Sequence, residues 1–415
     1  MVKKTNSKNI KLWIINQFAN TPDMPGSSRH YELAEYFAKQ NLEVDVFSSD
    51  FNLAIRKYFK LEDYQNFKTE KIKNINWHWL RVYPYKKNNW KRYMNIVSFC
   101  LNLLILQIMN VLKNSLPNII IASSPQLIAS YQTLIFAKIF RIKFIFEVRD
   151  IWPQILVDLG GSNPKSLVIR ILKLMEMGLY KYSDIVVVLA KGAKNYVESN
   201  GAREVIWLPN GPNLDDFHFS HLPLEPKTFN FLRPFRIIYA GAHGLANDLN
   251  NVIEAADLLR DEPIEIILIG DGPEKNKLLD KAKGFKNVIF KSPLSKTKIP
   301  IIMREADAIL ISLKDVSLFK YGISPNKLYD AYALGRPVIS TVGGVVNEEI
   351  ENNYIGFTTD PGRPDKLAKI IKKMYKLPRI EREKMSNMGR QMAEKIYSRE
   401  RIRNSFLKII KNNSK

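Results

Sequence analysis

Short, almost entirely apolar segments recur along this chain, and each is separated from the next by a segment with a helical residue pattern. Strands that are apolar on both sides belong to parallel sheets whose two faces are covered by helices, because water reaches neither side there. The sequence therefore predicts an α/β fold. In the first half we expect strands at 11–16, 43–48, 118–122, 143–148, 184–189 and 204–208, and helices at 29–40, 125–140 and 191–200.

The same alternation occurs a second time, after residues 212–234, which hold four prolines and little periodicity and are typical of a linker. We therefore predict two Rossmann-like, doubly wound parallel-sheet domains that face each other across a cleft. They comprise residues 1–211 and 235–396, and a last helix at 397–412 is expected to return to the first domain. The strands of the second domain are expected at 236–240, 264–269, 287–290, 308–312 and 337–340, before a mainly helical region at 363–412.

The chain of 415 residues has a formal net charge of +22, which favours anionic partners such as phosphorylated substrates or anionic lipid. No helix-turn-helix, zinc-finger spacing or RNA-recognition signature accompanies this charge, so no nucleic-acid partner is expected. Cys100 is the single cysteine, which excludes an intramolecular disulfide and is typical of a cytoplasmic protein. The basic N-terminus lacks the apolar core and cleavage site of a signal peptide.

A short helix in the second domain carries a phosphate-binding pattern. Ser324 is predicted to cap this helix, and Pro325 to occupy its first position. Asn326 and Lys327 then lie on the first turn, where unpaired backbone N–H groups and the lysine charge attract a phosphate. Asp330 lies on the same face as Lys327, where its carboxylate can accept ribose hydroxyls. A surface helix with one ion pair is the alternative interpretation.

The loop after the first predicted strand is a candidate contact on the first domain. Gly26 and Ser27 allow close approach of the backbone, and Ser27 can cap the helix that follows. We expect this loop to approach the donor of a transfer reaction, with His30 on the acceptor side. A plain strand-to-helix connection is the alternative interpretation.

The predicted strand at 143–148 ends in charged residues and a tryptophan, which is unusual for a buried strand. Glu147 and Arg149 can pair with each other. Asp150 lies at the tip of the loop and is the better candidate to line a reaction centre, because ligands of open parallel sheets bind at the carboxyl ends of strands. Arg149 and Trp152 are expected on the acceptor side.

Three glycine turns follow strands of the second domain. His243 lies in the first turn and could donate a hydrogen bond to a phosphate or a sugar, although a loop histidine without a ligand is the alternative. The turn after 264–269 resembles a dinucleotide fingerprint only loosely, since it lacks the third glycine, and it supports a nicotinamide enzyme weakly. The residues of these turns expected to bind the donor are Gly241, Gly244, Asp271, Gly272, Gly343 and Gly344.

In this order, the segments resemble the retaining glycosyltransferases of family 4, which have the GT-B fold. The resemblance covers nearly the whole chain and is closest to the fucosamine-transferase-like subgroup that builds bacterial surface polysaccharides such as O-antigen and capsule. Each motif is weak alone, but six in order are specific. They are Pro-Gly-Ser-Ser-Arg-His (25–30), Glu-Val-Arg-Asp-Ile-Trp-Pro (147–153), Leu-Pro-Asn-Gly (208–211), Tyr-Ala-Gly-Ala-His-Gly (239–244), Ile-Gly-Asp-Gly-Pro-Glu (269–274) and Ser-Pro-Asn-Lys-Leu-Tyr-Asp-Ala-Tyr-Ala-Leu-Gly-Arg-Pro-Val (324–338).

The resemblance implies a hexosyltransferase-type enzyme that needs neither metal nor cofactor. It would transfer a sugar, expected to be an N-acetylated amino sugar, from a UDP-sugar to an undecaprenyl-diphosphate-linked saccharide. It assigns Lys327 and His243 to the diphosphate, brings Gly26 and Ser27 to the donor, and places Asp150 at the reaction centre. Retention of configuration is implied, and front-face attack assisted by the departing phosphate is our working hypothesis.

One position departs from the family pattern. The family usually carries two glutamates eight residues apart, and these positions correspond to Gly322 and Asp330. Asp330 keeps the carboxylate, whereas a backbone amide would have to serve at Gly322. Gly322 keeps open a non-catalytic subunit that binds a nucleotide sugar. A GT-B-fold UDP-sugar epimerase is a further alternative function.

A region rich in basic and aromatic residues at 57–112 suits an anionic membrane surface. It ends in an apolar stretch at 96–112, which is marginal in length for a membrane span and could instead be a core helix. We expect a monotopic contact, and hence a peripheral location on the inner face of the plasma membrane. The residues concerned include Lys57, Tyr58, Phe59, Lys60, Lys71, Lys73, Trp77, Trp79, Trp90, Lys91 and Arg92.

Overall fold

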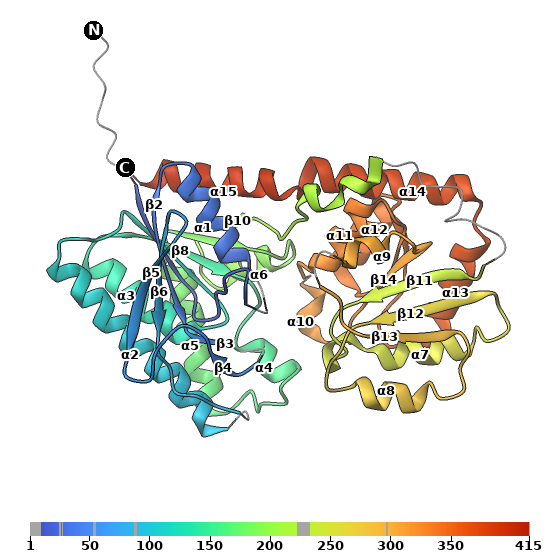
Figure 1. Ribbon diagram of the computed structural model, residues 1–415, viewed down its shortest axis with the longest axis horizontal. Helices are drawn as coiled ribbons and strands as arrows, with labels where there is room; N and C mark the ends of the chain where they lie inside the picture. Colours follow the sequence, from blue (N-terminus) through green and yellow to red (C-terminus); the bar gives the residue numbers. More distant parts are fainter. Residues whose placement is uncertain are drawn as a thin grey trace, which may run out of the picture.

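The computed structural model has two lobes, each built around its own sheet (Figure 1). The structure describes residues 10–24, 26, 28–52, 55–86, 89–221, 233–295, 298–321 and 323–414. Both sheets are covered by helices on their two faces, which is the α/β arrangement that the apolar strands predict.

The first sheet contains β1 (Lys11–Ile15), β2 (Glu43–Ser49), β5 (Phe67–Ile72), β6 (Ile75–Leu80), β7 (Ile119–Ser123), β8 (Lys143–Val148), β9 (Ile185–Val188) and β10 (Val205–Trp207). Their order in space is β10-β9-β8-β7-β1-β2-β6-β5. All neighbours are parallel except β5 and β6, which form an antiparallel hairpin at one edge. The sequence patterns did not predict this hairpin, because β5 is a lysine-containing strand with exposed positions and not an apolar run. A separate antiparallel pair is β3 (Phe51–Asn52) and β4 (Lys57–Tyr58).

Strand β6 places two tryptophans in the core. Trp77 and Trp79 are fully buried, and their Nε1 atoms donate to Ser48 Oγ at 2.7 Å and Glu70 Oε2 at 3.0 Å. Residues two apart in a strand point to the same side, which here is the covered side of the sheet. The prediction that these two tryptophans belong to a membrane-facing mixture of residues is therefore wrong.

Two helical layers cover the first sheet. Leu12 and Ile14 of β1 face α1 (Arg29–Lys39) and α15 (Arg399–Asn413), which form one layer. Trp13 and Ile15 face the other layer. The helices of that layer are α2 (Trp90–Leu112), α3 (Leu127–Ile139), α5 (Leu167–Tyr182) and α6 (Ala193–Ser199), and the short α4 (Gln154–Asp158) precedes α5.

The second sheet contains β11 (Phe235–Ala240), β12 (Ile264–Ile269), β13 (Val288–Lys291), β14 (Ala308–Ser312), β15 (Val338–Thr341) and β16 (Gly356–Thr358). All pairs are parallel, in the order β13-β12-β11-β14-β15-β16. This order is that of a doubly wound nucleotide-binding sheet, and it reverses between β11 and β14. The short edge strand β16 was not predicted.

The helices of the second lobe are α7 (Leu249–Asp257), α8 (Lys275–Lys281), α9 (Ile299–Met303), α10 (Ser317–Lys320), α11 (Asn326–Leu334), α12 (Gly344–Asn352), α13 (Pro364–Lys376) and α14 (Arg379–Met392). The 3-10 segments η1 (Leu214–His221) and η3 (Leu245–Asn247) and the π-helical turn η4 (Ala393–Tyr397) complete the structure. Residues 222–232 of the predicted linker lie outside the described residues.

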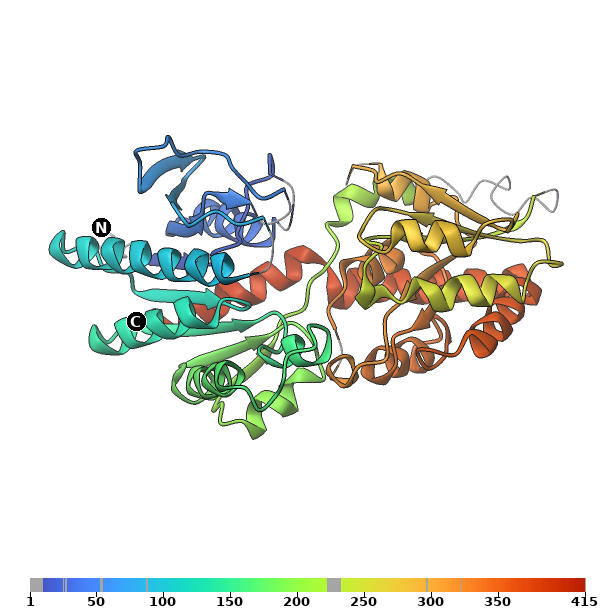
Figure 2. The same ribbon diagram turned by 90° about the horizontal axis from the view of Figure 1, so that it is seen from below.

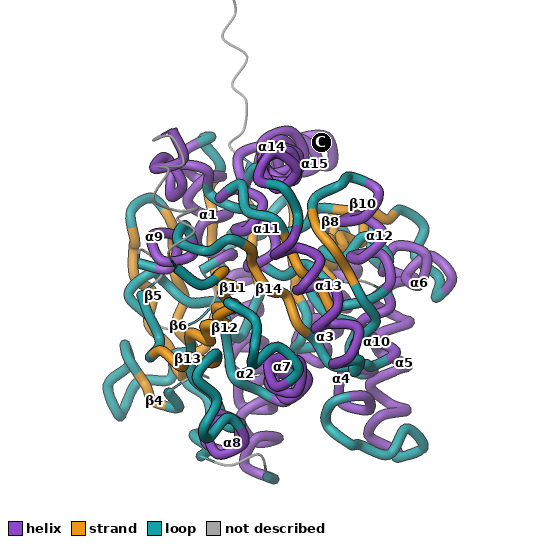
Figure 3. The backbone as a smooth tube through the Cα atoms, turned by 90° about the vertical axis from the view of Figure 1, so that its right-hand side faces the viewer, coloured by secondary structure: helices purple, strands orange, loops and turns teal. Residues whose placement is uncertain are grey.

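Helices α14 and α15 run end to end along one edge of the molecule, so the last helix lies on the first lobe (Figures 1 and 3). Phe406 of α15 packs edge-on against Phe37 of α1, with ring centroids 5.8 Å apart. Ile402 and Ile410 are buried beside it. This return brings the first turns of α15 to the boundary between the lobes.

Candidate functional site

The site lies where the strand orders of both sheets reverse. In the second sheet the reversal falls between β11 and β14, and in the first sheet β1 has β7 and β2 on its two sides. Loops that leave a sheet at such a reversal diverge and open a crevice for a ligand. The loop after β1 carries Gly26, and the loop after β11 carries Gly241.

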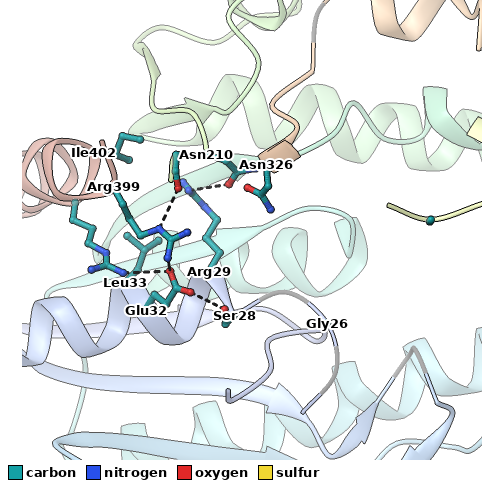
Figure 4. A pocket seen from close by; sticks show the side chains of 12 residues that line it. Gly26, Ser28, Arg29, Glu32, Leu33, Asn210, Asn326, Arg399 and Ile402 are labelled. Atoms are coloured by element: carbon teal, nitrogen blue, oxygen red, sulfur yellow. Dashed lines mark hydrogen bonds and ion pairs between the residues drawn. The ribbon is translucent and has the colours of Figure 1, made fainter. Parts of the chain in front are cut away.

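A cavity of about 660 Å³ lies between the lobes, within the range of about 300–1,000 Å³ that is typical of small-molecule sites. Side chains reach it from α1, from the segment after β10, from α11 and from α15 (Figure 4). Its charged lining consists of Arg29, Arg399 and Arg403 against Glu32, which suits an anionic ligand. The lining residues are Gly26, Ser28, Arg29, Glu32, Leu33, Asn210, Gly211, Ala242, Asn326, Arg399, Ile402 and Arg403.

Lys327 lies at the reversal point of the second sheet, on the first turn of α11. Its Nζ is 3.0 Å from Asn247 Oδ1 and 3.2 Å from Tyr239 Oη, and it lies 4.4 Å from the centroid of the Tyr239 ring. Burial lowers the pKa of Lys327 to about 7, and no carboxylate of the described residues offsets this effect. A cation held by neutral groups only is well suited to an anionic ligand, because ligand charge would restore its usual pKa.

The N-terminus of α11 is open toward the cavity. Asn326 is the first helical residue, Pro325 is the cap residue, and no side chain of the described residues caps the helix. The prediction that Ser324 caps it is wrong by one position. The Ser324 hydroxyl instead accepts from the backbone N–H of Asn210 at 2.7 Å. Backbone N–H groups at an uncapped helix start, beside a lysine amine, are an arrangement that can attract an anion such as a phosphate.

Asn210 connects the two lobes at this point. Its side-chain amide donates to the carbonyl of Ser324 at 2.8 Å, and its Oδ1 accepts from Arg29 Nη1 at 3.2 Å. Together with the backbone bond to Ser324, these contacts fix the start of α11 relative to α1.

We expect Asn210→Ala to destabilise the fold by about 1–3 kcal/mol, since a net hydrogen bond contributes about 0.5–1.5 kcal/mol and Asn210 loses two side-chain bonds. Urea unfolding measures this difference. Asn213→Ala is the matched control, because the Asn213 amide donates to Asp216 at the surface, at 3.0 Å, and does not connect the lobes. Equal stability of the two variants would contradict a connecting role for Asn210.

A buried ion cluster in the first lobe lies next to the cavity and includes Arg29, one of the cavity's lining residues. Glu147 is fully buried and accepts from Arg29 Nη2 at 2.9 Å and from His30 Nε2 at 3.1 Å, with Ser123 Oγ at 3.0 Å. Burial alone would raise the pKa of Glu147, but the Arg29 charge and the His30 hydrogen bond outweigh it and hold this pKa well below its ordinary value. The expected pairing of Glu147 with Arg149 is thus corrected: the partner is Arg29.

His30 belongs to this cluster and not to an acceptor surface. Its side chain is 1% exposed, and burial lowers its pKa below the ordinary value despite the contact with Glu147. A side chain so covered does not reach an acceptor, so the expectation for His30 is corrected. Arg29, one residue earlier, lines the cavity instead, because successive residues at the start of α1 point in different directions.

Asp150 lies beyond the end of β8, beside a small hollow between the lobes. The hollow is also lined by Arg149, and by Leu318 and Phe319 of the second lobe. Asp150 is exposed at the rim of this hollow, and desolvation by the neighbouring protein raises the pKa of its carboxylate, against the opposing charge of Arg149. Trp152 is partly buried, and its Nε1 has no hydrogen-bond partner among the described residues. Asp150 and Arg149 therefore face the boundary between the lobes.

The loop after β11 is packed too tightly for its histidine to face the cavity. His243 is fully buried, and its ring lies between Tyr239 and Phe290, at centroid distances of 6.2 and 6.1 Å. Burial lowers its pKa, and Lys275 lowers it further. Both ring nitrogens lack a hydrogen-bond partner among the described residues, and the covered ring does not support the assignment of His243 to the diphosphate. Its neighbour Ala242 lines the cavity instead.

Glycines let the two loops of the second lobe approach each other. Gly270 has φ = +147°, and a Cβ there would lie 1.9 Å from the carbonyl oxygen of Gly241. A Cβ on Gly272 would lie 2.4 Å from the His243 carbonyl. The backbone N–H of His243 donates a hydrogen bond to the backbone carbonyl of Asp271 at 2.8 Å. Gly272 thus serves packing between loops, whereas Gly241 lies next to Lys327.

The remaining predicted residues lie in and around the same loops. Gly26 lines the cavity with φ = +124°, while Ser27 and Gly322 lie outside the described residues. Asp330 is half-buried on α11 one turn after Lys327. Gly343, Gly344 and Gly244 are partly or fully exposed in their turns. In the described part of the chain, no three His, Cys, Asp or Glu side chains gather as metal ligands.

The motifs did not reveal several residues of the cavity. Arg399 and Arg403 of α15 pair with Glu32 of α1 at 2.8 and 3.2 Å. Arg29 and Asn210 lie within two of the six motifs, but nothing local to them indicated a contact. No sequence signal could have identified these pairs, because they join positions far apart in the chain.

Residues 224–392 match the protein family described as glycosyl transferases group 1. Over 411 residues the chain is 23% identical to WcaI of Escherichia coli K12, whose name assigns it to colanic acid biosynthesis as a glycosyl transferase. This alignment covers 94% of the chain and 97% of WcaI. WbjE of Pseudomonas aeruginosa, named as a probable glycosyltransferase, is 22% identical over 57% of the chain and 60% of WbjE.

Solved structures share the fold over nearly the whole chain. Sucrose-phosphate synthase of Thermosynechococcus elongatus has a TM-score of 0.73 at 14% identity, covering 97% of this chain and 99% of that one. Anabaena Alr3699/HepE in complex with UDP has a TM-score of 0.67 at 14% identity and covers 97% and 100%. The predicted GT-B fold is confirmed, and the matches to glycosyltransferases in sequence support the predicted enzyme class.

Proposed function

We propose that this GT-B glycosyltransferase transfers a sugar from a UDP-sugar to a lipid-linked saccharide during assembly of a bacterial surface polysaccharide, with retention of configuration. The observation that carries the proposal is Lys327, a half-buried amine without a carboxylate partner among the described residues. It lies at the uncapped start of α11, beside a cavity between the lobes.

The donor would bind with its diphosphate at the start of α11. Backbone N–H groups and the Lys327 amine supply positive charge there. Asp330, one turn further, would accept the ribose hydroxyls, and Gly26 would approach the donor from the first lobe. UDP is the nucleotide we favour, because HepE was solved with UDP and with UDP-glucose, and the Escherichia coli trehalose-6-phosphate enzyme with UDP-2-fluoro glucose.

The chemistry would follow from charge development on the leaving group. Breaking the bond between sugar and phosphate builds negative charge on the diphosphate, which preorganised N–H groups and Lys327 stabilise where it grows. Asp150 lines the boundary from the first lobe and would face the sugar with Arg149 and Trp152 on the acceptor side. The acceptor hydroxyl would attack on the same face that the diphosphate leaves, which retains the configuration.

The acceptor and the sugar are proposed from resemblance. The fucosamine-transferase-like motifs and the colanic acid relative favour a surface-polysaccharide acceptor carried on a lipid diphosphate, and an N-acetylated amino sugar as the transferred group. The test is transfer of radiolabelled sugar from UDP-GlcNAc and related donors to a lipid extract of bacterial membranes. Labelled lipid would support the proposal. Epimerised nucleotide sugar without labelled lipid would favour an epimerase, and donor binding without turnover a non-catalytic subunit.

Donor binding should take up a proton. The Lys327 amine has a pKa of about 7 in the free protein, and the diphosphate would raise it, so affinity is highest below pH 7 and falls as pH rises above it. At pH 8 we expect uptake of about 0.9 proton per UDP-sugar, because about 90% of an amine with this pKa is then neutral. Calorimetry in two buffers of different ionisation enthalpy measures the uptake. No uptake, or equal uptake in Lys327→Arg, would contradict the assignment.

A further inference from the structure

Three helices on the first lobe leave an apolar surface uncovered. Helices α2, α3 and α5 lie on the face of the first sheet opposite to α15, and α3 packs between the other two. Figure 2 views the molecule from this side. The inner sides of these helices bury Phe99, Leu103 and Leu179 in the core, so their positions are fixed by the sheet.

The outer side of α2 is apolar along its whole length. Its exposed residues recur every three or four positions, which defines one continuous stripe on a helix. Trp90, Leu101 and Leu112 are 60%, 57% and 78% exposed. The stripe comprises Trp90, Tyr93, Met94, Val97, Leu101, Leu104, Ile105, Ile108 and Leu112.

The neighbouring helices extend this surface. A Cβ on Gly178 of α5 would lie 2.6 Å from the Tyr131 ring of α3, which shows how closely these two helices pack. Exposed apolar residues on them are Ile135, Ile139 and Phe140 at the end of α3, and Leu167, Val168, Ile171, Leu174, Met177 and Tyr182 on and beside α5. We name this set, together with the α2 stripe, the three-helix surface. Monomeric proteins seldom expose contiguous apolar areas of this extent without a partner.

The charges around the three-helix surface are mostly positive, apart from Asp184, which pairs with Lys138 and Lys143 at 3.2 and 3.6 Å. Between Glu70 and Glu147 the chain contains no Asp or Glu, although 41 of its 415 residues are acidic. The one acidic residue of α5 is Glu176. Its side chain is fully buried, forms an ion pair with Lys173 and accepts a hydrogen bond from Tyr180. Basic residues on or beside the helices are Lys86, Lys91, Arg92, Lys113, Lys138, Arg141, Lys143, Lys165, Arg170 and Lys181.

We propose that the three-helix surface docks on an anionic lipid bilayer, with α2, α3 and α5 lying in the plane of the interface. An apolar face bordered by tryptophan, tyrosine and basic residues matches the acyl and phosphate layers of such a surface. A second copy of the chain is disfavoured, because a two-fold contact would bring like basic residues together. By length and composition α2 could cross a membrane, and 33% of its apolar window is buried. The buried residues, such as Phe99 and Leu103, pack into the core of the first lobe, which favours a helix lying on the bilayer.

Docking in this orientation brings the bilayer to one end of the boundary between the lobes. Helix α4 lies next to α5 in the chain. The carboxylate of its Asp158 accepts hydrogen bonds from the Ser317 hydroxyl and the Leu318 backbone N–H of α10, at 2.7 and 2.9 Å. Asp150 lies a few residues before α4. The surface extends the proposed function, since an acceptor anchored in the lipid would reach the Asp150 side of the cleft. Bilayer binding itself does not depend on that function.

Vesicle flotation of the full chain tests the proposal. Vesicles of phosphatidylcholine with 30% phosphatidylglycerol should bind the protein, and pure phosphatidylcholine vesicles should bind it at least tenfold more weakly. The combined variant Leu101→Gln, Ile105→Gln, Ile108→Gln should lose at least tenfold in binding. Its control is Leu258→Gln, Ile301→Gln, Ile380→Gln, which replaces three similarly exposed apolar residues of the second lobe and should bind as the unmodified chain does.

A charge variant separates the electrostatic contribution to vesicle binding from the apolar contribution. Lys91→Gln, Lys113→Gln, Arg170→Gln should remove most of the preference for anionic vesicles. Thermal unfolding and the shift caused by UDP should be unchanged in every variant, so a failed donor site and a failed docking surface give different results. Vesicle binding that is absent, or that the three-helix variant leaves intact, would overturn the proposal. So would a dimer of the unmodified chain, seen by light scattering, that this variant dissociates.

Discussion

Lys327→Met should lower transfer activity by about 100-fold or more, since removal of one preorganised charge-stabilising group typically has an effect of about 10²–10³ in kcat. Methionine is also unbranched and is one atom shorter, but it removes the charged Nζ that lies 4.4 Å from the Tyr239 ring centroid beside the start of α11. The thermal stability of the free protein should be equal or higher, because the amine is already held at an unfavourable, lowered pKa. Steady-state kinetics with a UDP-sugar and calorimetric unfolding measure the two effects.

Lys369→Met is the matched control for this variant. Lys369 is exposed on α13, so the same replacement there should change neither activity nor donor binding. A Lys327→Met enzyme that keeps most of its activity would show that the diphosphate is bound elsewhere. An inactive enzyme that is also strongly destabilised would show that the amine is structural.

Glu147→Gln should destabilise the protein by about 3–5 kcal/mol, the usual effect of breaking a buried ion pair by removing one partner. The amide would leave Arg29 without its anion at 2.9 Å and would weaken the hydrogen bond with His30. Urea unfolding at pH 7 measures the difference. Glu43→Gln is the control, because Glu43 is 48% exposed and pairs with Lys11 at 3.0 Å near the surface, where such pairs contribute about 1 kcal/mol or less.

The pH dependence of this difference has a defined sign. The pKa of Glu147 is lower in the folded protein than in the unfolded chain, so its contribution is fully present above the unfolded value of about 4.3 and is lost as pH falls below it. The stability gap between the unmodified protein and Glu147→Gln should therefore be constant from pH 6 to 8 and should narrow below about pH 4.3. A gap that widens toward acid would contradict the ion pair.

The parts of the fold that the sequence predicts well are those with local signals. The parallel strands are continuous apolar runs, and segments of this length and composition seldom form anything but buried strands when helical segments separate them. The edge hairpin of β5 and β6 carries a mixed pattern, with lysines at exposed positions of β5, and its two buried tryptophans look the same in sequence as interfacial ones. Only the pairing of β6 with β2 settles which side they face.

The residues of the site also differ in whether a local sequence signal reveals them. The start of α11 is visible in sequence, because Pro325, Asn326 and Lys327 are adjacent and act through the local helix geometry. The partners of Glu147 are not visible, because Arg29 is 118 positions away in the chain. Arg403 is 371 positions from Glu32. Whether a loop histidine such as His243 is covered depends on residues of other strands, here Phe290 of β13.

The most direct measurement is thermal stabilisation of the purified protein by UDP, GDP, ADP and NAD, beside the Asp330→Ala variant. Binding to the folded state adds about 2.7 kcal/mol of stability at a hundredfold excess of ligand over Kd. We expect a shift with UDP that exceeds the shifts with the other three nucleotides and is lost in Asp330→Ala. A shift of equal size with all of them, or with none, would contradict a UDP-sugar donor held at α11.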